Sequence, residues 1–322
     1  MVHIDPTNIR VWSLLGQRGT LGHALLEIAK ENEKIIAITS DLARISGLDR
    51  FGKIFPERLI NTGIAEQNML GIAAAFANED FIPFAISFAN FSVLRACEPT
   101  RHFMGYMKRN VKLVGLSSGF AMGIFGNTHY CKEDIAILRA IPGITIISPA
   151  DSTELVKAME ASSKYHGPVY LRLTGVMNNP VVYKENYDFE IGKAIMLKKG
   201  TDITIIATGS MVNNSLKAAE ILEKKGISAT VIDMHTIKPL DDHIIDQEIS
   251  SSKLIVTVEE HAKIGGLGGA VAEYLSSVQH HPVLLRLGIE DAFQPAGDYH
   301  YMLEQNELLP EQIANNIRKN YQ

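Results

Sequence analysis

The sequence is poor in the features that assign a protein to a specialised class. Its 322 residues include only two cysteines, Cys97 and Cys131, without a Cys-x-x-Cys spacing, so we expect buried thiols in a reduced compartment. Positive charge is not in excess, since 31 Lys and Arg stand against 36 Asp and Glu, for a formal net charge of −5. A nucleic-acid partner is therefore not expected, because binding a polyanion needs a basic surface.

Long apolar runs are also missing. No uncharged apolar stretch approaches the roughly 18 residues that a membrane-spanning helix needs. The N-terminal residues MVHIDPTNIR lack the apolar segment of a signal peptide. We therefore expect a protein without membrane association, located in the cytoplasm.

What the sequence does contain is a regular alternation of short β-branched runs with helical stretches. Buried strands are predicted at residues 35–39, 111–116, 144–148 and 169–173 and, after a polar linker at 178–190, at 203–208, 229–233, 254–258 and 283–287. This pattern predicts an α/β protein of two domains, residues 1–180 and residues 191–322. Each is expected to have three α/β/α layers around a mostly parallel sheet.

An acidic residue, Glu66, heads the apolar face of one predicted helix. Met69, Leu70 and Ala73 follow it at i+3, i+4 and i+7, which places Glu66 on the face that should be buried. A lone carboxylate is rarely buried unless it is paired or has a chemical task. The alternative is a first-turn acid that reaches solvent and is stabilised by the helix dipole. Periodicity alone leaves both interpretations open.

The motif around this acid, GIAEQ, resembles the pyrimidine-domain motif of the transketolase family of thiamine diphosphate enzymes. Four later segments also resemble that family, in the family's order: FIPFAISFANF at 81–91, LRAIPGITIISPAD at 138–151, VIDMHTIKPLD at 231–241 and VTVEEHAKIGGLGG at 256–269. The resemblance implies that residues 1–180 form a pyrimidine-binding domain and residues 191–322 a transketolase C-terminal domain.

The Gly-Asp-Gly motif, with which this family holds the cofactor diphosphate through a metal ion, is absent from the sequence. The resemblance therefore implies the second subunit of a split transketolase. Its partner is expected to be an N-terminal-half subunit that carries Gly-Asp-Gly and holds Mg²⁺ or Ca²⁺, in an α2β2 assembly. No metal ligands are expected in this chain.

The resemblance assigns Glu66 to the cofactor's aminopyrimidine ring. In the family a buried glutamate shares a proton with N1′ of that ring, which lets the cofactor lose its C2 proton, and burial favours the protonated form of a carboxyl group. Phe88 and Phe91 match the family's aromatic wall, although Leu94 stands where relatives have a third aromatic residue. Asp41 matches an acid beside the cofactor at the boundary between the two subunits.

Other matches concern the substrate. His129 matches a catalytic histidine that contacts the donor sugar near C1, while Arg18 and Arg172 match arginines that bind the terminal phosphate. Ser46 is assigned to the same anion. As isolated residues, the histidine would be a loop residue and the arginines members of surface ion pairs.

Two positions of the predicted substrate loop, residues 116–130, depart from the family pattern. Phe125 replaces an acid that selects the stereochemistry of the donor's hydroxyl groups, and Ser117 replaces a phosphate-binding histidine. These changes favour an anionic sugar with a less highly charged head group, such as a sulfonate, or a deoxy or branched sugar. An ordinary ketose phosphate remains the alternative donor.

The resemblance as a whole implies transfer of a two-carbon ketol unit from a ketose to an aldose with thiamine diphosphate. An alternative keeps the cofactor but changes the reaction, as in the β subunit of a 2-oxo acid dehydrogenase or a deoxyxylulose phosphate synthase-like enzyme. A non-catalytic scaffold is the third possibility. The joint presence of Glu66, Phe88, Phe91 and His129 argues against that last interpretation.

Overall fold

Seven strands form the N-terminal sheet of the computed structural model, which describes residues 2–321. Their order across the sheet is β10-β5-β6-β4-β3-β1-β2, and all are parallel except β10. The strands are short and rich in β-branched residues: β1 (Ile35–Thr39), β2 (Leu59–Asn61), β3 (Ile82–Phe88), β4 (Lys112–Leu116), β5 (Thr145–Ile147), β6 (Val169–Arg172) and β10 (Thr236–Lys238).

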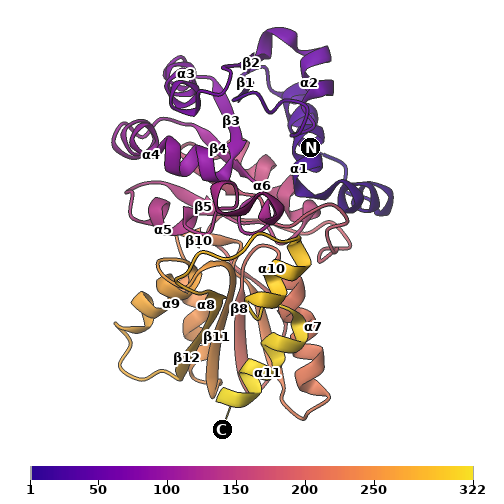
Figure 1. The fold of residues 1–322 in the computed structure, drawn as a ribbon, viewed down its shortest axis with the longest axis vertical. Helices are drawn as coiled ribbons and strands as arrows, with labels where there is room; N and C mark the ends of the chain where they lie inside the picture. Colours follow the sequence, from indigo (N-terminus) through magenta and orange to yellow (C-terminus); the bar gives the residue numbers. More distant parts are fainter. Residues whose placement is uncertain (1, 322) are drawn as a thin grey trace.

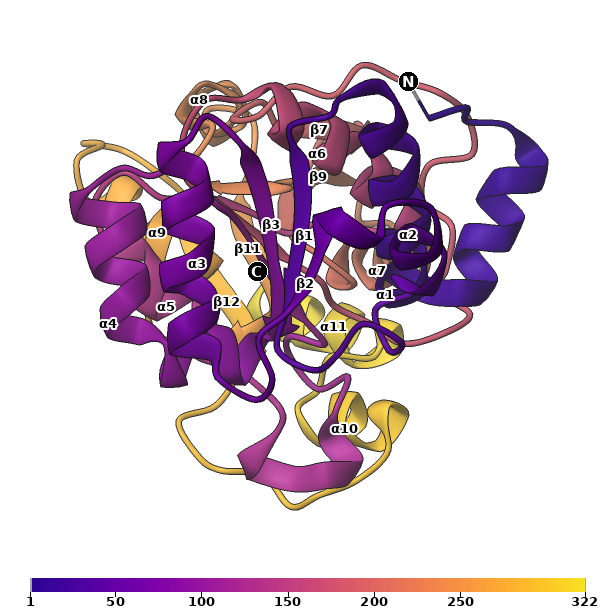
Figure 2. The ribbon, with the colours of Figure 1, turned by 90° about the horizontal axis from the view of Figure 1, so that it is seen from above.

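Helices cover both faces of this sheet, as Figure 2 shows from above. One face packs against α1 (Pro6–Glu31), α2 (Asp49–Ile54) and α6 (Ser152–Lys164). The other packs against α3 (Glu66–Asn78), η3 (Thr100–Tyr106) and α5 (Asp134–Arg139). Short turns of helix connect these elements: η1 (Pro56–Arg58), η2 (Asn90–Arg95), α4 (Cys97–Pro99) and η4 (Gly123–Thr128).

The C-terminal sheet has five strands in the order β12-β11-β8-β9-β7. Their bounds are β7 (Ile195–Lys198), β8 (Ile203–Ala207), β9 (Ala229–Asp233), β11 (Leu254–Ala262) and β12 (Val283–Ile289). One face packs mainly against α7 (Met211–Glu223), α10 (Tyr299–Gln305) and α11 (Pro310–Asn320), and the other against α8 (Asp242–Ile249) and α9 (Leu267–Leu275). The α/β fold with two layered sheets is thus confirmed (Figure 1).

The two sheets are not independent, because β10 follows the C-terminal strand β9 in the chain but pairs antiparallel with β5 of the N-terminal sheet. The predicted linker at 178–190 has neither helix nor strand, yet it is anchored. The backbone N–H groups of Val182 and Tyr183 both donate to the carboxylate of Asp151, at 2.7 and 2.9 Å. Residues 1–180 and 191–322 therefore share a hydrogen-bonded boundary, and the division between them remains a prediction.

No helix among residues 2–321 is both long enough and apolar enough to cross a membrane.

Candidate active site

Glu66 is the first residue of α3 and its side chain is only 1% exposed. Met69, Leu70 and Ala73 are buried on the same face, so the burial expected from the spacing is confirmed and the solvent-reaching alternative is wrong. The Oε2 atom of Glu66 accepts a hydrogen bond from Nη1 of Arg95 at 2.8 Å. Its Oε1 atom has a longer contact of 3.5 Å with the Ser87 hydroxyl, which in turn accepts from Ser40.

The predicted aromatic wall and the predicted histidine form one continuous cluster. Phe88 ends β3, and its ring meets that of Phe91 in η2 edge-on, with 6.2 Å between centroids. Phe91 contacts His129 at 5.6 Å, and His129 contacts Phe125 at 5.3 Å. A 2.6 Å hydrogen bond from the Asn90 amide to the Thr128 carbonyl holds η2 against the loop that carries His129. The fold thus brings together residues that are about 40 positions apart in the sequence.

Arg95 joins this cluster to Glu66, and it was not predicted from the sequence. Its guanidinium carbon lies 4.2 Å from the centre of the Phe91 ring while Nη1 contacts Glu66. The side chain is 46% exposed, so the ion pair has one buried and one open member. One feature of the sequence could have indicated Arg95. It follows Phe91 by four residues and is adjacent to Leu94, where the sequence departs from the family pattern.

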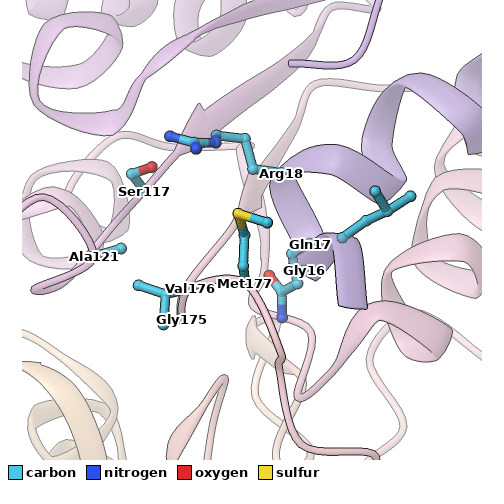
Figure 3. Close-up of a pocket in the computed structure, with 9 residues that line it drawn as sticks. Gly16, Gln17, Arg18, Ser117, Ala121, Gly175, Val176 and Met177 are labelled. Atoms are coloured by element: carbon cyan, nitrogen blue, oxygen red, sulfur yellow. The ribbon is translucent and has the colours of Figure 1, made fainter. Parts of the chain in front are cut away.

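A separate cavity of about 260 Å³ brings Arg18 and Ser117 together (Figure 3). It forms because α1 is interrupted at Gly16, whose backbone φ of +68° suits glycine, and because residues 175–177 pack against the interruption. Arg18 projects across the cavity toward Ser117. Within residues 2–321 Arg18 has no ion-pair partner, so its guanidinium is free to bind an anion.

Arg172 does not lie in this cavity, which corrects its assignment to the substrate. The residue is fully buried between the domains. Its Nε donates to Asp134 at 2.9 Å and its Nη2 donates to the Glu260 carbonyl at 2.8 Å. Burial alone would raise the pKa of Asp134, but the Arg172 charge holds that pKa below its ordinary value. The arginine is therefore part of an internal ion pair with no surface for a substrate.

Ser46 is fully buried and its hydroxyl donates to the backbone carbonyl of Leu42, which corrects its assignment to the substrate anion. Asp41 is exposed at the end of β1, with a backbone φ of +62°, and accepts a 3.2 Å hydrogen bond from the Asn61 amide. Its role beside the cofactor remains a prediction.

The residues present fit one half of thiamine diphosphate. A buried carboxyl group beside an apolar aromatic wall suits an aminopyrimidine ring, which has polar ring nitrogens and flat apolar faces. For the diphosphate, the described residues contain no group of three or more His, Cys, Asp or Glu side chains arranged to hold a metal ion.

Comparisons with known proteins agree with this geometry. Residues 16–176 match the family described as transketolase, pyrimidine binding domain, and residues 192–313 match transketolase, C-terminal domain. The 6-deoxy-6-sulfo-D-fructose transketolase subunit SqwH of Clostridium sp. (strain MSTE9) is 39% identical, covering 92% of this chain and 92% of that protein. An apulose-4-phosphate transketolase subunit of Phocaeicola vulgatus is 37% identical, covering 89% and 92%.

Two further matches compare the length of this chain with that of its relatives. A solved structure described as a split gene transketolase, inactive beta4 tetramer, superposes with a TM-score of 0.85 at 36% identity, covering 95% of this chain and 97% of that one. The 1-deoxy-D-xylulose-5-phosphate synthase of Caldanaerobacter subterraneus is 35% identical, but the match covers only 48% of its length.

The chain therefore belongs to the transketolase family, whose members depend on thiamine diphosphate. Within that family it corresponds to the second subunit of a split transketolase, a transferase subunit.

Proposed function

We propose that this chain binds the aminopyrimidine half of thiamine diphosphate and, with a partner subunit, transfers a two-carbon ketol unit from an anionic ketose to an aldose. The observation that carries the proposal is the buried Glu66 carboxyl group beside the Phe88, Phe91 and His129 cluster. That cluster remains open to solvent at Phe125, which is 54% exposed, so a ring and a sugar have access to it.

Each residue of the cluster has a distinct task in this proposal. The cofactor supplies the electron sink for cleaving and forming the carbon–carbon bond. Glu66 holds a proton toward N1′, and the two phenylalanine rings keep water from the pyrimidine face. His129 donates a hydrogen bond to a donor-sugar oxygen, and Thr128 fixes its ring, since the Thr128 hydroxyl lies 2.8 Å from Nδ1. Asp41 borders the cofactor at the boundary with the partner.

The partner subunit is proposed to supply what this chain lacks. It would carry the Gly-Asp-Gly motif and hold the diphosphate through Mg²⁺ or Ca²⁺, in an α2β2 assembly. The similar split transketolase solved as a beta4 tetramer is described as inactive, which supports a requirement for a second kind of subunit. Activity in the isolated chain would contradict this part of the proposal.

Arg18 is proposed as the site for the donor's terminal anion, because its guanidinium faces a cavity without a competing carboxylate. Ser117 and Phe125 remove a cation and an acid that ordinary transketolases place near the donor. A sulfonated or branched sugar suits these changes. Two similar subunits are named for a sulfofructose and for apulose 4-phosphate, and this agreement favours the unusual donors over an ordinary ketose phosphate.

The test is a donor comparison in the reconstituted two-subunit enzyme. Ketol transfer to an aldose acceptor is measured with xylulose 5-phosphate, fructose 6-phosphate and 6-deoxy-6-sulfofructose, each with and without thiamine diphosphate. Cofactor-dependent transfer supports the reaction, and the highest kcat/KM identifies the donor. Condensation of pyruvate with glyceraldehyde 3-phosphate instead of ketol transfer would favour the deoxyxylulose phosphate synthase alternative. A wide preference for xylulose 5-phosphate would reject the unusual donors but not the transketolase reaction.

His129→Ala separates the histidine from the cofactor site in the same assay. It should lower kcat/KM for the donor while cofactor affinity stays unchanged, because the imidazole is assigned to the sugar. An unchanged donor kcat/KM would show that His129 is a loop residue without a role in donor binding.

A further inference from the structure

Arg95 lies where the proposed function requires the pyrimidine ring. Its guanidinium group lies over the Phe91 ring, with the central carbon 4.2 Å from the ring centroid, and its Nη1 donates a hydrogen bond to Oε2 of Glu66. These are the two contacts assigned to the ring, an apolar face and a carboxyl group. We infer that Arg95 is a gate that fills the pyrimidine subsite when the cofactor is absent and leaves it when the cofactor binds. This inference rests on the proposed function.

Arg95 and the ring would compete for the same two contacts. Oε2 of Glu66 accepts from Arg95, and Oε1 lies 3.5 Å from the buried Ser87 hydroxyl. The face of the Phe91 ring is covered by the guanidinium. A ring that takes Oε2 and the Phe91 face therefore has to displace the Arg95 side chain.

The side chain of Arg95 can leave without unfolding its surroundings. It is 46% exposed, whereas Glu66 is 1% exposed, so the guanidinium has an open path to water. Its backbone is held in place, since the Gln67 amide donates to the Arg95 carbonyl at 3.1 Å. Rotation about side-chain bonds is enough to clear Glu66 and Phe91, and the aromatic cluster stays assembled.

Calorimetry on the assembled two-subunit protein tests the gate without measuring turnover. Thiamine diphosphate with Mg²⁺ is titrated into the wild type and each variant, and the dissociation constants are compared. Arg95→Met should bind the cofactor about 3- to 30-fold more tightly, because no ion pair has to break. Arg95→Gln gives an independent second variant.

Two further variants complete the design. In a Glu66→Gln background, Arg95→Met should change cofactor affinity much less, because the ion pair is already absent. Arg101→Met removes an exposed arginine on the neighbouring η3 and should behave as the wild type. Weaker or unchanged cofactor affinity in both Arg95 variants would overturn the gate while leaving the proposed function in place. Absence of cofactor binding in the wild-type assembly would overturn both.

Discussion

Two regions of the molecule contain buried acids: the rim, formed by Glu66, Arg95 and Phe91, and the seam between the two domains, formed by α6, the segment at 178–190 and β9. The two regions differ in what their acids contact. Glu66 pairs with Arg95, which is 46% exposed. Glu154, on α6 at the seam, is fully buried, and its partners are buried or half-buried. Its Oε2 accepts the Ala150 N–H at 2.7 Å and its Oε1 accepts the Tyr187 hydroxyl at 3.1 Å. The rim is open on one side, and the seam is closed.

The same contrast separates the two arginines that the sequence assigned to one anion. Arg18 faces a cavity without an ion-pair partner among the described residues, whereas Arg172 is fully buried against Asp134. A buried charge alone therefore does not identify a functional residue in this protein. Charges with an exposed partner, or with none among the described residues, lie around Glu66 and in the Arg18 cavity, and charges with buried partners lie between the domains.

Glu66→Gln should have the largest effect at the rim. The amide cannot supply the acidic proton proposed for N1′, so kcat of the reconstituted enzyme should fall by roughly 10²–10⁴. The melting temperature should change little, because glutamine fills the same volume. Steady-state kinetics at saturating cofactor measures the effect, and a kcat near that of the wild type would exclude the role.

Arg172→Met should have the largest effect at the seam, on stability and not on donor binding. Removing the cation leaves Asp134 buried without its partner, which should cost about 3–5 kcal/mol of unfolding free energy. Urea unfolding measures this loss. The matched control is Glu273→Gln, which breaks an ion pair between Arg139 and an acid that is 69% exposed, and should cost less than about 1 kcal/mol. Equal losses in the two variants would contradict the distinction between closed and open pairs.

Arg18→Met should act on substrate binding alone. Loss of a charge-assisted hydrogen bond should raise KM for a donor with a terminal anion by roughly 10- to 150-fold, with kcat preserved. A donor without that anion should be unaffected. Arg10→Met, on an exposed position of α1, is the control. If every donor loses affinity equally, the cavity around Arg18 is not the anion site.

Asp233→Asn should change how seam stability depends on pH. Burial raises the pKa of Asp233 from 3.8 to about 7, so between these values the folded chain holds a proton that the unfolded chain has lost. Wild-type stability from this group is therefore lost as the pH rises through that window, by about 1.4 kcal/mol per pH unit.

Asparagine does not titrate and still accepts the 2.8 Å hydrogen bond from Tyr183. The unfolding free energy of the variant relative to the wild type should therefore increase between about pH 4.5 and 6.5. Urea titrations at several pH values measure this difference. A difference that does not vary with pH would show that Asp233 is already ionised in the folded chain.

Local patterns predicted the elements well and the partners of side chains poorly. The strand at 35–39 and the helix beginning near Glu66 follow from β-branched runs and helical spacing, which act over a few residues. Asp151 caps α6 through a 2.8 Å hydrogen bond from the Glu154 N–H, which is likewise a contact within a few residues. The pairing of β10 with β5 was not, because antiparallel pairing between distant segments leaves no local signature.

The errors in the site have the same origin. Arg172 and Arg18 are alike as residue types, and only the packing of β6 against the C-terminal domain shows which one is enclosed. Ser46 is enclosed because its turn packs against Gly19 and Gly22 of α1, which are distant from it in the sequence. Arg95 was missed because its ion pair with Glu66 links positions 29 residues apart. These are long-range contacts, which the spacing of residues does not encode.

The placement of β10 has a consequence for motion. A hinge between the domains would ordinarily sit in the segment at 178–190, which has neither helix nor strand. Here any opening at that segment would also have to pull β10 away from β5 and break main-chain hydrogen bonds in the N-terminal sheet. The β10–β5 pairing therefore restrains rotation of one domain against the other, and the segment at 178–190 cannot act as a free hinge.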